Sequence, residues 1–179
     1  LDAYEAFKVI CQGSNYGGGA SEIYQRMPKS AKVGGLTVDR ITGIQEWYFS
    51  ECPEIAEWQR KIESNVRQFR YVENVFGYRI WFFDRLEGTI FKQAIAAVPQ
   101  STVGCLINRG YKNIFDNEPE IQVLLQVHDS LAGQYPVRIR DYAVKKIVDC
   151  CTVPLPYSSG ILTIPVGIKT SSISWGECA

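Results

Sequence analysis

Leu124-Leu125-Gln126-Val127-His128-Asp129-Ser130-Leu131 is the stretch that decides the fold of the C-terminal half of this sequence. It predicts an apolar strand that delivers a histidine and a carboxylate to a turn, and His128 is the only histidine in the chain. A carboxylate at the end of a buried strand must either lose hydration, at a cost of several kcal/mol, or meet a cation. Asp and Ser are also common turn residues, so an ordinary polar turn is the alternative interpretation.

The composition is that of one globular domain. The chain has 179 residues, of which 46% are apolar and 12% aromatic, and this is enough to bury a core. Basic and acidic residues number 19 each, so the net charge is zero and gives no general case for a nucleic-acid partner. Any such case must come from local patches of charge.

The cysteines and the apolar pattern bear on where the protein resides. Six cysteines lack CxxC spacing and a partnering pair of histidines, which argues against a zinc site and favours reduced thiols in a cytosol. No run of about eighteen apolar residues and no signal peptide occurs, so we expect a cytoplasmic protein with no membrane partner. If the source is viral, the compartment would be the host cytoplasm. The chain starts at Leu1 in a helical pattern without a methionine, which favours a fragment.

The first helix is predicted over residues 2–15. Four side chains recur at intervals of four and therefore share one stripe of it, namely Tyr4, Lys8, Gln12 and Tyr16. The three glycines at 17–19 end this helix, because glycine adopts the left-handed conformation that a helix end requires. They do not match a phosphate-binding loop, since such a loop follows a strand, precedes a helix and carries GK[ST].

Three more helices are predicted before residue 70, over residues 21–27, 37–52 and 53–69. The last of them holds the most basic part of the chain, formed by Arg60, Lys61, Arg67 and Arg70. Such a row is either a solvated helix face or a surface that contacts phosphates, and the local pattern leaves both interpretations open.

The rest of the chain predicts a mixture of hairpins and helices. In order we expect a hairpin around Gly77 over 71–82, one or two helices over 86–112, a polar turn over 113–119, the hairpin of the opening stretch with its second arm at 131–135, a helix over 138–151 and a strand over 161–169. Pro99 should kink or split the long helical segment. The fold class is therefore α+β, mostly helical with a small antiparallel sheet.

Asp129 is the residue on which a catalytic function depends. His128, Asp129 and Ser130 cannot form a Ser-His-Asp triad, because neighbouring strand residues point to opposite faces. A phosphohydrolase of the His-Asp type needs several histidines, and this chain has one. Asp129 remains as an oxygen ligand for Mg²⁺, which typically takes one or two carboxylates and fills its other positions with phosphate and water. A second carboxylate is then required.

Three motifs stand in order along the chain. They are Lys8-x₃-Gln12-x₃-Tyr16-Gly17, Val98-Pro99-Gln100-Ser101-Thr102 and Leu125-Gln126-Val127-His128-Asp129. The first resembles motif B, in the fingers helix of family A DNA polymerases, the group of bacterial DNA polymerase I and phage replicative enzymes. The second resembles the family's Pro-x-Gln-Gly-Thr helix, and the third matches palm motif C almost letter for letter. Residues 71–79 resemble the segment between the two helical motifs, and 164–176 resemble the ending of phage members.

The resemblance implies a site for the incoming nucleotide on the first helix. Lys8 would place a point charge on the phosphates of the dNTP and, with Asp129, would be catalytic. Tyr16 would close over the nascent base pair, where its aromatic face can stack. Gln12 would lie beside the nucleotide between these two residues.

The resemblance also implies contacts with primer-template DNA and a metal site. Lys92 would lie on the template-contacting helix, and three neutral side chains would donate to the minor groove and to the primer-terminal phosphate, namely Gln100, Gln126 and His128. Asp129 would hold Mg²⁺ for a two-metal phosphoryl transfer, in which the primer 3′-hydroxyl attacks the α-phosphate and pyrophosphate leaves.

Several positions depart from the family pattern. They are Tyr4 for an arginine, Gln12 for an aromatic residue, Lys92 for an arginine, Ala96 for an asparagine and Ser130 for a carboxylate. Motif A, with the first metal-binding Asp and the sugar-gating Glu, is not in the sequence, and neither are the thumb and exonuclease regions. We therefore expect the upstream part of the polymerase chain to be a partner of this one.

These inferences assign residues 1–70 to the fingers and 71–179 to the C-terminal fingers and palm of a DNA-directed DNA polymerase. We expect the isolated chain to be inactive, because one metal carboxylate is missing. A protein that has kept the fold and nucleic-acid binding but has lost catalysis is the alternative, favoured by the neutral charge and by Tyr4, Gln12 and Ala96.

Overall fold

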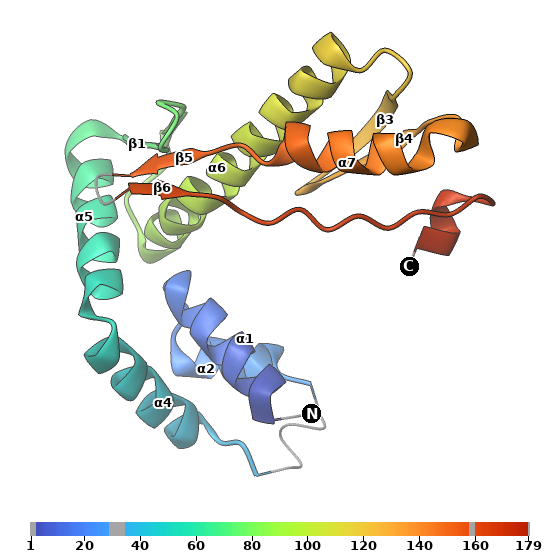
Figure 1. The fold of residues 1–179 in the computed structure, drawn as a ribbon. Coiled ribbons are helices and arrows are strands. Elements are labelled where there is room, and N and C mark those ends of the chain that lie inside the picture. Colours follow the sequence, from blue (N-terminus) through green and yellow to red (C-terminus); the bar gives the residue numbers. More distant parts are fainter. Residues whose placement is uncertain (1–2, 29–34, 158–159, 179) are drawn as a thin grey trace. The chain divides into compact units, whose positions relative to one another are not determined.

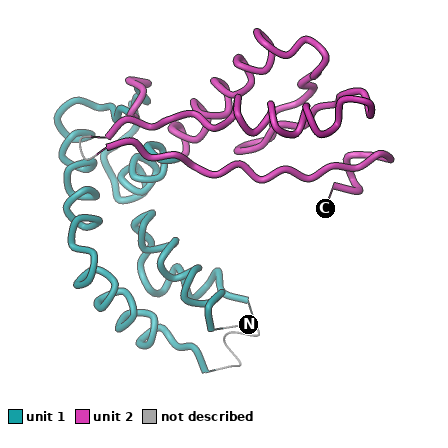
Figure 2. The backbone as a smooth tube through the Cα atoms, viewed as in Figure 1, with its two compact units in different colours: residues 1–73, 79–99 teal, residues 74–78, 100–179 magenta. Residues whose placement is uncertain are grey.

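The computed structural model describes residues 3–28, 35–157 and 160–178, and Figure 1 shows their helices and strands. The chain divides into two compact units, which Figure 2 colours separately. Unit 1 comprises residues 1–73 and 79–99, and unit 2 comprises residues 74–78 and 100–179. The assignment of 1–70 and 71–179 to fingers and palm regions stays a prediction.

Unit 1 is built from helices and one small hairpin. Its helices are α1 (Ala3–Asn15), α2 (Ala20–Arg26), α4 (Val38–Glu51) and α5 (Pro53–Phe69). The Thr37 side chain caps α4 by accepting from the Arg40 N–H, and Pro53 begins α5, where a missing N–H costs nothing. Gly17 has φ 73°, so the predicted glycine stop after α1 is confirmed.

Two apolar clusters hold unit 1 together. Ile10, Ile23, Met27 and Ile41 join α1, α2 and α4, and Ile41 is fully buried. The second cluster packs α5 and the hairpin against the start of α6 (Gly88–Asn117), and it is made of Ile62, Val66, Val72, Phe82, Ile90, Phe91, Ala94 and Ile95. In the second cluster α5 and α6 contribute residues spaced three or four apart, which is the pattern of an amphipathic helix packed on a core.

The long helix α6 differs from the sequence prediction. Pro99 lies inside it without splitting it, and residues 113–117 of the polar turn expected at 113–119 form its last turn. Helical spacing satisfies the polar side chains there, since Lys112 pairs with Asp116 at 2.5 Å and Asn117 Nδ2 donates to the Asn113 carbonyl at 2.9 Å. Among the described helices, α6 alone is long and apolar enough for a membrane span, a test that a core helix of a soluble protein also passes.

Unit 2 contains the end of α6, two hairpins and one further α-helix. Its elements after α6 are β3 (Gln122–Val127), β4 (Ser130–Gln134), η1 (Val137–Ile139), α7 (Arg140–Cys151), β5 (Leu155–Tyr157), β6 (Gly160–Leu162) and η2 (Trp175–Cys178). Ile114, Ile121 and Ala143 form a core cluster between α6, the start of β3 and α7. The carboxylate of Glu118 is nearly buried beside it, where it accepts from Tyr142 Oη at 2.8 Å and lies 3.5 Å from Lys146 Nζ.

The described strands form three two-stranded antiparallel sheets. The hairpin expected around Gly77 is present as β1 (Tyr71–Glu73) and β2 (Arg79–Trp81). The final strand expected at 161–169 is wrong in extent, because β6 ends at Leu162 and pairs with β5, which was not predicted. Pro165 lacks the N–H that a longer ladder would need. The prediction of a mostly helical α+β fold with small antiparallel sheets is confirmed.

Candidate nucleotide, DNA and metal site

The stripe predicted on the first helix is present on α1. Lys8 and Gln12 are exposed, and Tyr16 follows the last residue of α1 and donates its N–H to the Gln12 carbonyl at 3.3 Å. Lys8 lies 3.7 Å from Glu5, and both side chains are about half exposed. Such a surface pair contributes little, so the Lys8 ammonium remains available to an anionic ligand.

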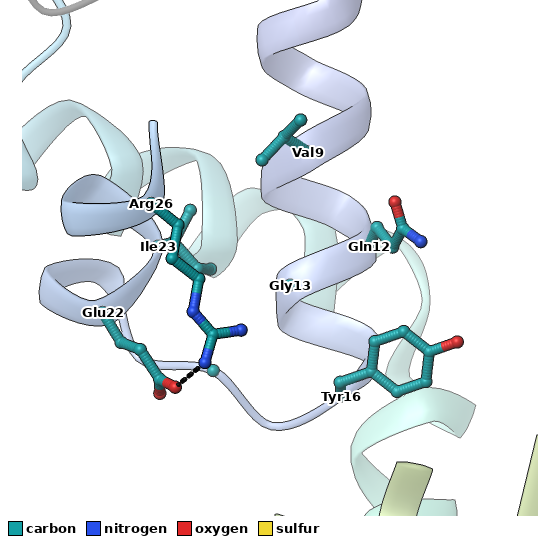
Figure 3. Close-up of a pocket in the computed structure, with 8 residues that line it drawn as sticks. Val9, Gln12, Gly13, Tyr16, Glu22, Ile23 and Arg26 are labelled. Carbon is teal, nitrogen blue, oxygen red and sulfur yellow. Dashed lines mark hydrogen bonds and ion pairs between the residues drawn. The ribbon is translucent and has the colours of Figure 1, made fainter. Parts of the chain in front are cut away.

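Two cavities of unit 1 share Gln12 and Tyr16. The first, of about 220 Å³, lies between α1 and α2, and Figure 3 shows Gln12 and Tyr16 one turn apart beside it and the Glu22–Arg26 pair on α2. The second, of about 290 Å³, is also lined by Asn15, Ile55, Trp58 and Pro99. Ligand pockets usually measure about 300–1,000 Å³, so each cavity has room for part of a nucleotide.

Polar side chains from α4 and α5 fix the end of α1 next to Tyr16. Gln59 Nε2 donates to the carbonyls of Ser14 and Asn15 at 2.8 and 3.1 Å, and Gln45 Nε2 donates to Ser14 Oγ and to the Gly18 carbonyl, both at 2.9 Å. Tyr48 Oη donates to Asn15 Oδ1 at 2.9 Å. The last carbonyls of a helix have no partner within the helix, and these side chains supply two of them with donors.

Sequence reasoning missed these positioning residues. Gln45 follows Ile44, and Gln59 follows Trp58, so each amide borders an apolar helix face that packs on a core. A partly buried amide beside such a face needs a polar partner, and this was the signal available in the sequence. The identity of the partner was not available, because it lies 27 to 45 residues away along the chain.

We expect the substitution Gln59→Met to lower the free energy of unfolding by about 1–3 kcal/mol, because the Asn15 carbonyl loses its side-chain donor and the Ser14 carbonyl keeps only the Gly17 N–H, while the volume is kept. Urea unfolding of the 179-residue chain measures this. Gln68→Met, at an exposed position of the same helix, is the matched control and should change stability by less than about 0.5 kcal/mol. Equal effects of the two substitutions would contradict the role assigned to Gln59.

Lys92, predicted to contact the template, is held by an ion pair within unit 1. Its Nζ lies 2.5 Å from Glu22 Oε2, and the other oxygen of Glu22 lies 2.7 Å from Arg26. The hydrogen bond and the charge of Lys92 together lower the pKa of the Glu22 carboxyl. This pair links α2 to α6, and a phosphate would have to compete with Glu22 for Lys92.

Asp129 occupies a tight turn in unit 2. Val127 pairs with Ser130, so His128 and Asp129 form a two-residue connection between β3 and β4. His128 has φ 52°, the left-handed conformation that the first position of such hairpin turns requires. Ser130 Oγ donates to the Val127 carbonyl at 2.8 Å and closes the turn. The predicted strand-turn-strand around Asp129 is therefore confirmed.

The environment of Asp129 differs from the buried one that the sequence predicted. Leu124 and Leu125 are 64% and 47% exposed, and Asp129 is exposed as well, so β3 is not a buried strand and Asp129 is not desolvated. A register shift between Val123 and Leu125 leaves Leu124 out of the ladder. The apolar run suggested burial, but nothing in the described part of the chain covers these leucines.

Asp129 fits Mg²⁺ as a single ligand. The described residues contain no group of three or more His, Cys, Asp or Glu side chains that could hold a metal ion. An exposed carboxylate can still supply one or two oxygens to Mg²⁺, which accepts phosphate and water for the rest. The role of Asp129 as a metal ligand, and its need for a second carboxylate, stay predictions.

The predicted site residues fall into two groups. Unit 1 holds Lys8, Gln12, Tyr16 and Lys92, and unit 2 holds Gln100, Gln126, His128 and Asp129. Gln12 and Tyr16 meet at the two cavities, whereas Lys8 does not line them. Gln100 is exposed on α6, and Gln126 and His128 are exposed near the β3–β4 turn, where neutral donors can reach an external ligand. The roles assigned to these residues stay predictions.

Comparison with known proteins gives relatives by sequence and by structure, although no family model matches the chain. DNA polymerase I of Helicobacter pylori, strains 26695 and J99, is 24% identical over 132 residues, which are 69% of this chain and 14% of the relative. The chain therefore spans about 14% of the length of these curated relatives.

A solved structure of the polymerase domain of Pol1 from M. smegmatis, in complex with DNA primer-template and dNTP, matches this fold with a TM-score of 0.64. The match covers 81% of this chain and 26% of that one, at 19% identity. This chain thus has the fold of part of the polymerase domain of DNA polymerase I, and it is distantly similar to DNA polymerase I in sequence.

Proposed function

We propose that this chain is the fingers and C-terminal palm part of a phage-like family A DNA polymerase, which adds nucleotides from dNTPs to a primer 3′-hydroxyl under the direction of a DNA template. The observation that carries the proposal is the exposed Asp129 at the β3–β4 turn, in a chain with this fold. A carboxylate presented to solvent at a two-residue turn between paired strands is a suitable metal ligand.

In this proposal α1 binds the incoming nucleotide. Lys8, whose only described ion pair is the loose one with Glu5, attracts the triphosphate. Gln12 and Tyr16 border the two cavities, where an aromatic ring and an amide can contact the base and the sugar. The donors from Gln45 and Gln59 keep this end of α1 in place, which lowers the cost of ordering the site when the nucleotide binds.

Unit 2 supplies the groups for the primer terminus. Asp129 would hold Mg²⁺, which lowers the pKa of a bound hydroxyl and stabilises charge on phosphate oxygens. His128 and Gln126 are exposed beside Asp129, and Gln100 is exposed on α6, so each can donate to DNA. A second carboxylate, from the upstream part of the polymerase chain, completes the metal site in this proposal.

A nucleic-acid-binding protein that has lost catalysis is the second candidate. The zero net charge and the engagement of Lys92 by Glu22 favour it, because both reduce the positive charge available to DNA. The two candidates differ in nucleotide incorporation by the intact polypeptide that contains this chain. The catalytic candidate also requires an aspartate upstream to act with Asp129.

We expect the intact polypeptide to extend a primer as its template directs, in the presence of Mg²⁺ and all four dNTPs. We expect the 179-residue chain alone to give no extension, because the proposed mechanism needs a second metal-binding carboxylate from the upstream part of the polymerase chain. Gel analysis of a labelled primer measures both. DNA binding without extension by the intact polypeptide would establish the second candidate, and extension by the chain alone would show that another of its own acids completes the site.

A further inference from the structure

A row of aromatic side chains lies on the outer face of the β1–β2 hairpin in unit 1. Tyr71 pairs with Trp81 across the hairpin, and their ring centroids are 4.8 Å apart. Phe69 lies 6.1 Å from Tyr71, and Phe83 lies 6.4 Å from Trp81 with ring planes within 9° of parallel. These four residues, Phe69, Tyr71, Trp81 and Phe83, are called the aromatic row below.

The aromatic row is exposed although its neighbours are buried. Phe69, Trp81 and Phe83 are 48%, 50% and 85% exposed, whereas Val72 and Phe82, which alternate with them, are at most 8% exposed. Successive residues of a strand point to opposite faces, so Val72 and Phe82 anchor the hairpin in the core and the row projects from it. The rings are thus held by a packed element and kept in contact with solvent.

The segment that carries the aromatic row has an excess of basic residues. Residues 60–85 contain six Lys or Arg and three Asp or Glu, in a chain whose net charge is zero. The Arg79 guanidinium lies 4.8 Å from the Tyr71 ring centroid and is fixed by Glu73 at 2.6 Å. Arg70, also exposed, donates to the Asp84 carbonyl at 3.0 Å, which orients its side chain without neutralising its charge.

We propose that the aromatic row binds single-stranded DNA, by stacking unpaired bases on Trp81 and Phe83 while the surrounding arginines contact the phosphates. Stacking on aromatic faces together with a basic surface is the usual basis of single-strand binding without sequence preference. A protein partner would also use Trp, Tyr and Arg. The excess of positive charge favours a phosphate-bearing ligand instead.

This site is distinct from the α1 stripe, from its two cavities and from Asp129, and none of those residues belongs to it. Only the choice of DNA over RNA rests on the proposed function. In a template-dependent polymerase, the unpaired template would be the strand that occupies the row. Stacking would then hold bases that have not yet been copied.

Binding of a fluorescein-labelled 20-nucleotide oligo(dT) to the full chain, measured by anisotropy at low salt, tests the proposal. We expect Trp81→Ala with Phe83→Ala to weaken binding by about tenfold or more, since each stacked base contributes substantially. Trp81→Phe should keep most of the affinity but remove the quenching of tryptophan emission that stacking produces. Trp175→Ala, at a tryptophan 65% exposed in η2, is the matched control and should bind like the wild type.

Three results would overturn the proposal. They are no binding of oligo(dT) by the wild-type chain, equal losses for the row variant and the Trp175 variant, and unchanged affinity in the row variant. The last result would assign the aromatic row to a protein partner. The two proposals fail in different assays. Failure of the proposed function would appear as absent primer extension by the intact polypeptide. Failure of the aromatic-row proposal would appear as unchanged oligo(dT) affinity in the row variant.

Discussion

Replacing Asp129 by alanine in the intact polypeptide should lower the rate of nucleotide incorporation by about a thousandfold or more. Metal-assisted stabilisation of phosphoryl transfer contributes several kcal/mol, and about 1.4 kcal/mol corresponds to each tenfold in rate. Because Asp129 is exposed at a turn and packs on no core cluster, its loss should leave the fold intact. Binding of primer-template should change little, since metal ligands act mainly on the reaction.

Single-turnover primer extension measures this effect, and anisotropy of a labelled primer-template measures binding in parallel. Asp116→Ala is the matched control, because Asp116 is also exposed in unit 2 and makes only a surface pair with Lys112. The control should extend primers at the wild-type rate. An Asp129→Ala protein with full activity would end the assignment of a metal to this turn.

Gly133→Ala should be the next most damaging substitution, although position 133 touches no ligand in this proposal. A Cβ at this position would lie 2.7 Å from the Gln122 carbonyl oxygen and 3.4 Å from the Val123 Cα, both of which are backbone atoms that cannot swing aside. Gly133 pairs with Val123 beside the register shift of β3. The hairpin must deform to relieve the contact, and Asp129 at its turn would move with it.

A displacement of about 1 Å in a catalytic group can lower the rate by about a hundredfold, and we expect an effect of this size on primer extension by the intact polypeptide. Gly104→Ala is the control, because its Cβ would meet no atom within 4 Å, and in helix α6 it should raise stability slightly. Circular dichroism would show that both variants fold. Wild-type activity in Gly133→Ala would show that the hairpin tolerates the added methyl group.

The sequence predicted correctly those features that depend on residues close together along the chain. The stripe of α1, the stop at Gly17 and the strand-turn-strand around Asp129 follow from spacing and from turn chemistry, and all are present in the structure. Motif order along the chain likewise predicted the likeness to DNA polymerase I.

The predictions that were wrong or missing concern residues whose structure depends on partners that the local sequence pattern cannot identify. Polar residues at 113–117 suggested a turn, but their side chains bond to one another within α6. β5 is a short strand that exists through its pairing with β6, and Gln59 finds its carbonyls 44 and 45 residues away. The apolar run at Leu124 suggested burial, yet burial depends on which element packs over a strand.

The exposure of β3 also bears on how the chain behaves at high concentration. In the described part of the chain β3 pairs with β4 alone, and its sequence from Gln122 to Val127 carries no charged residue and no proline. Natural edge strands usually carry charged residues or proline, because an uncharged edge with exposed leucines can pair with the same edge of another molecule. The hairpin that presents Asp129 therefore also offers an edge at which a second copy of the chain can pair.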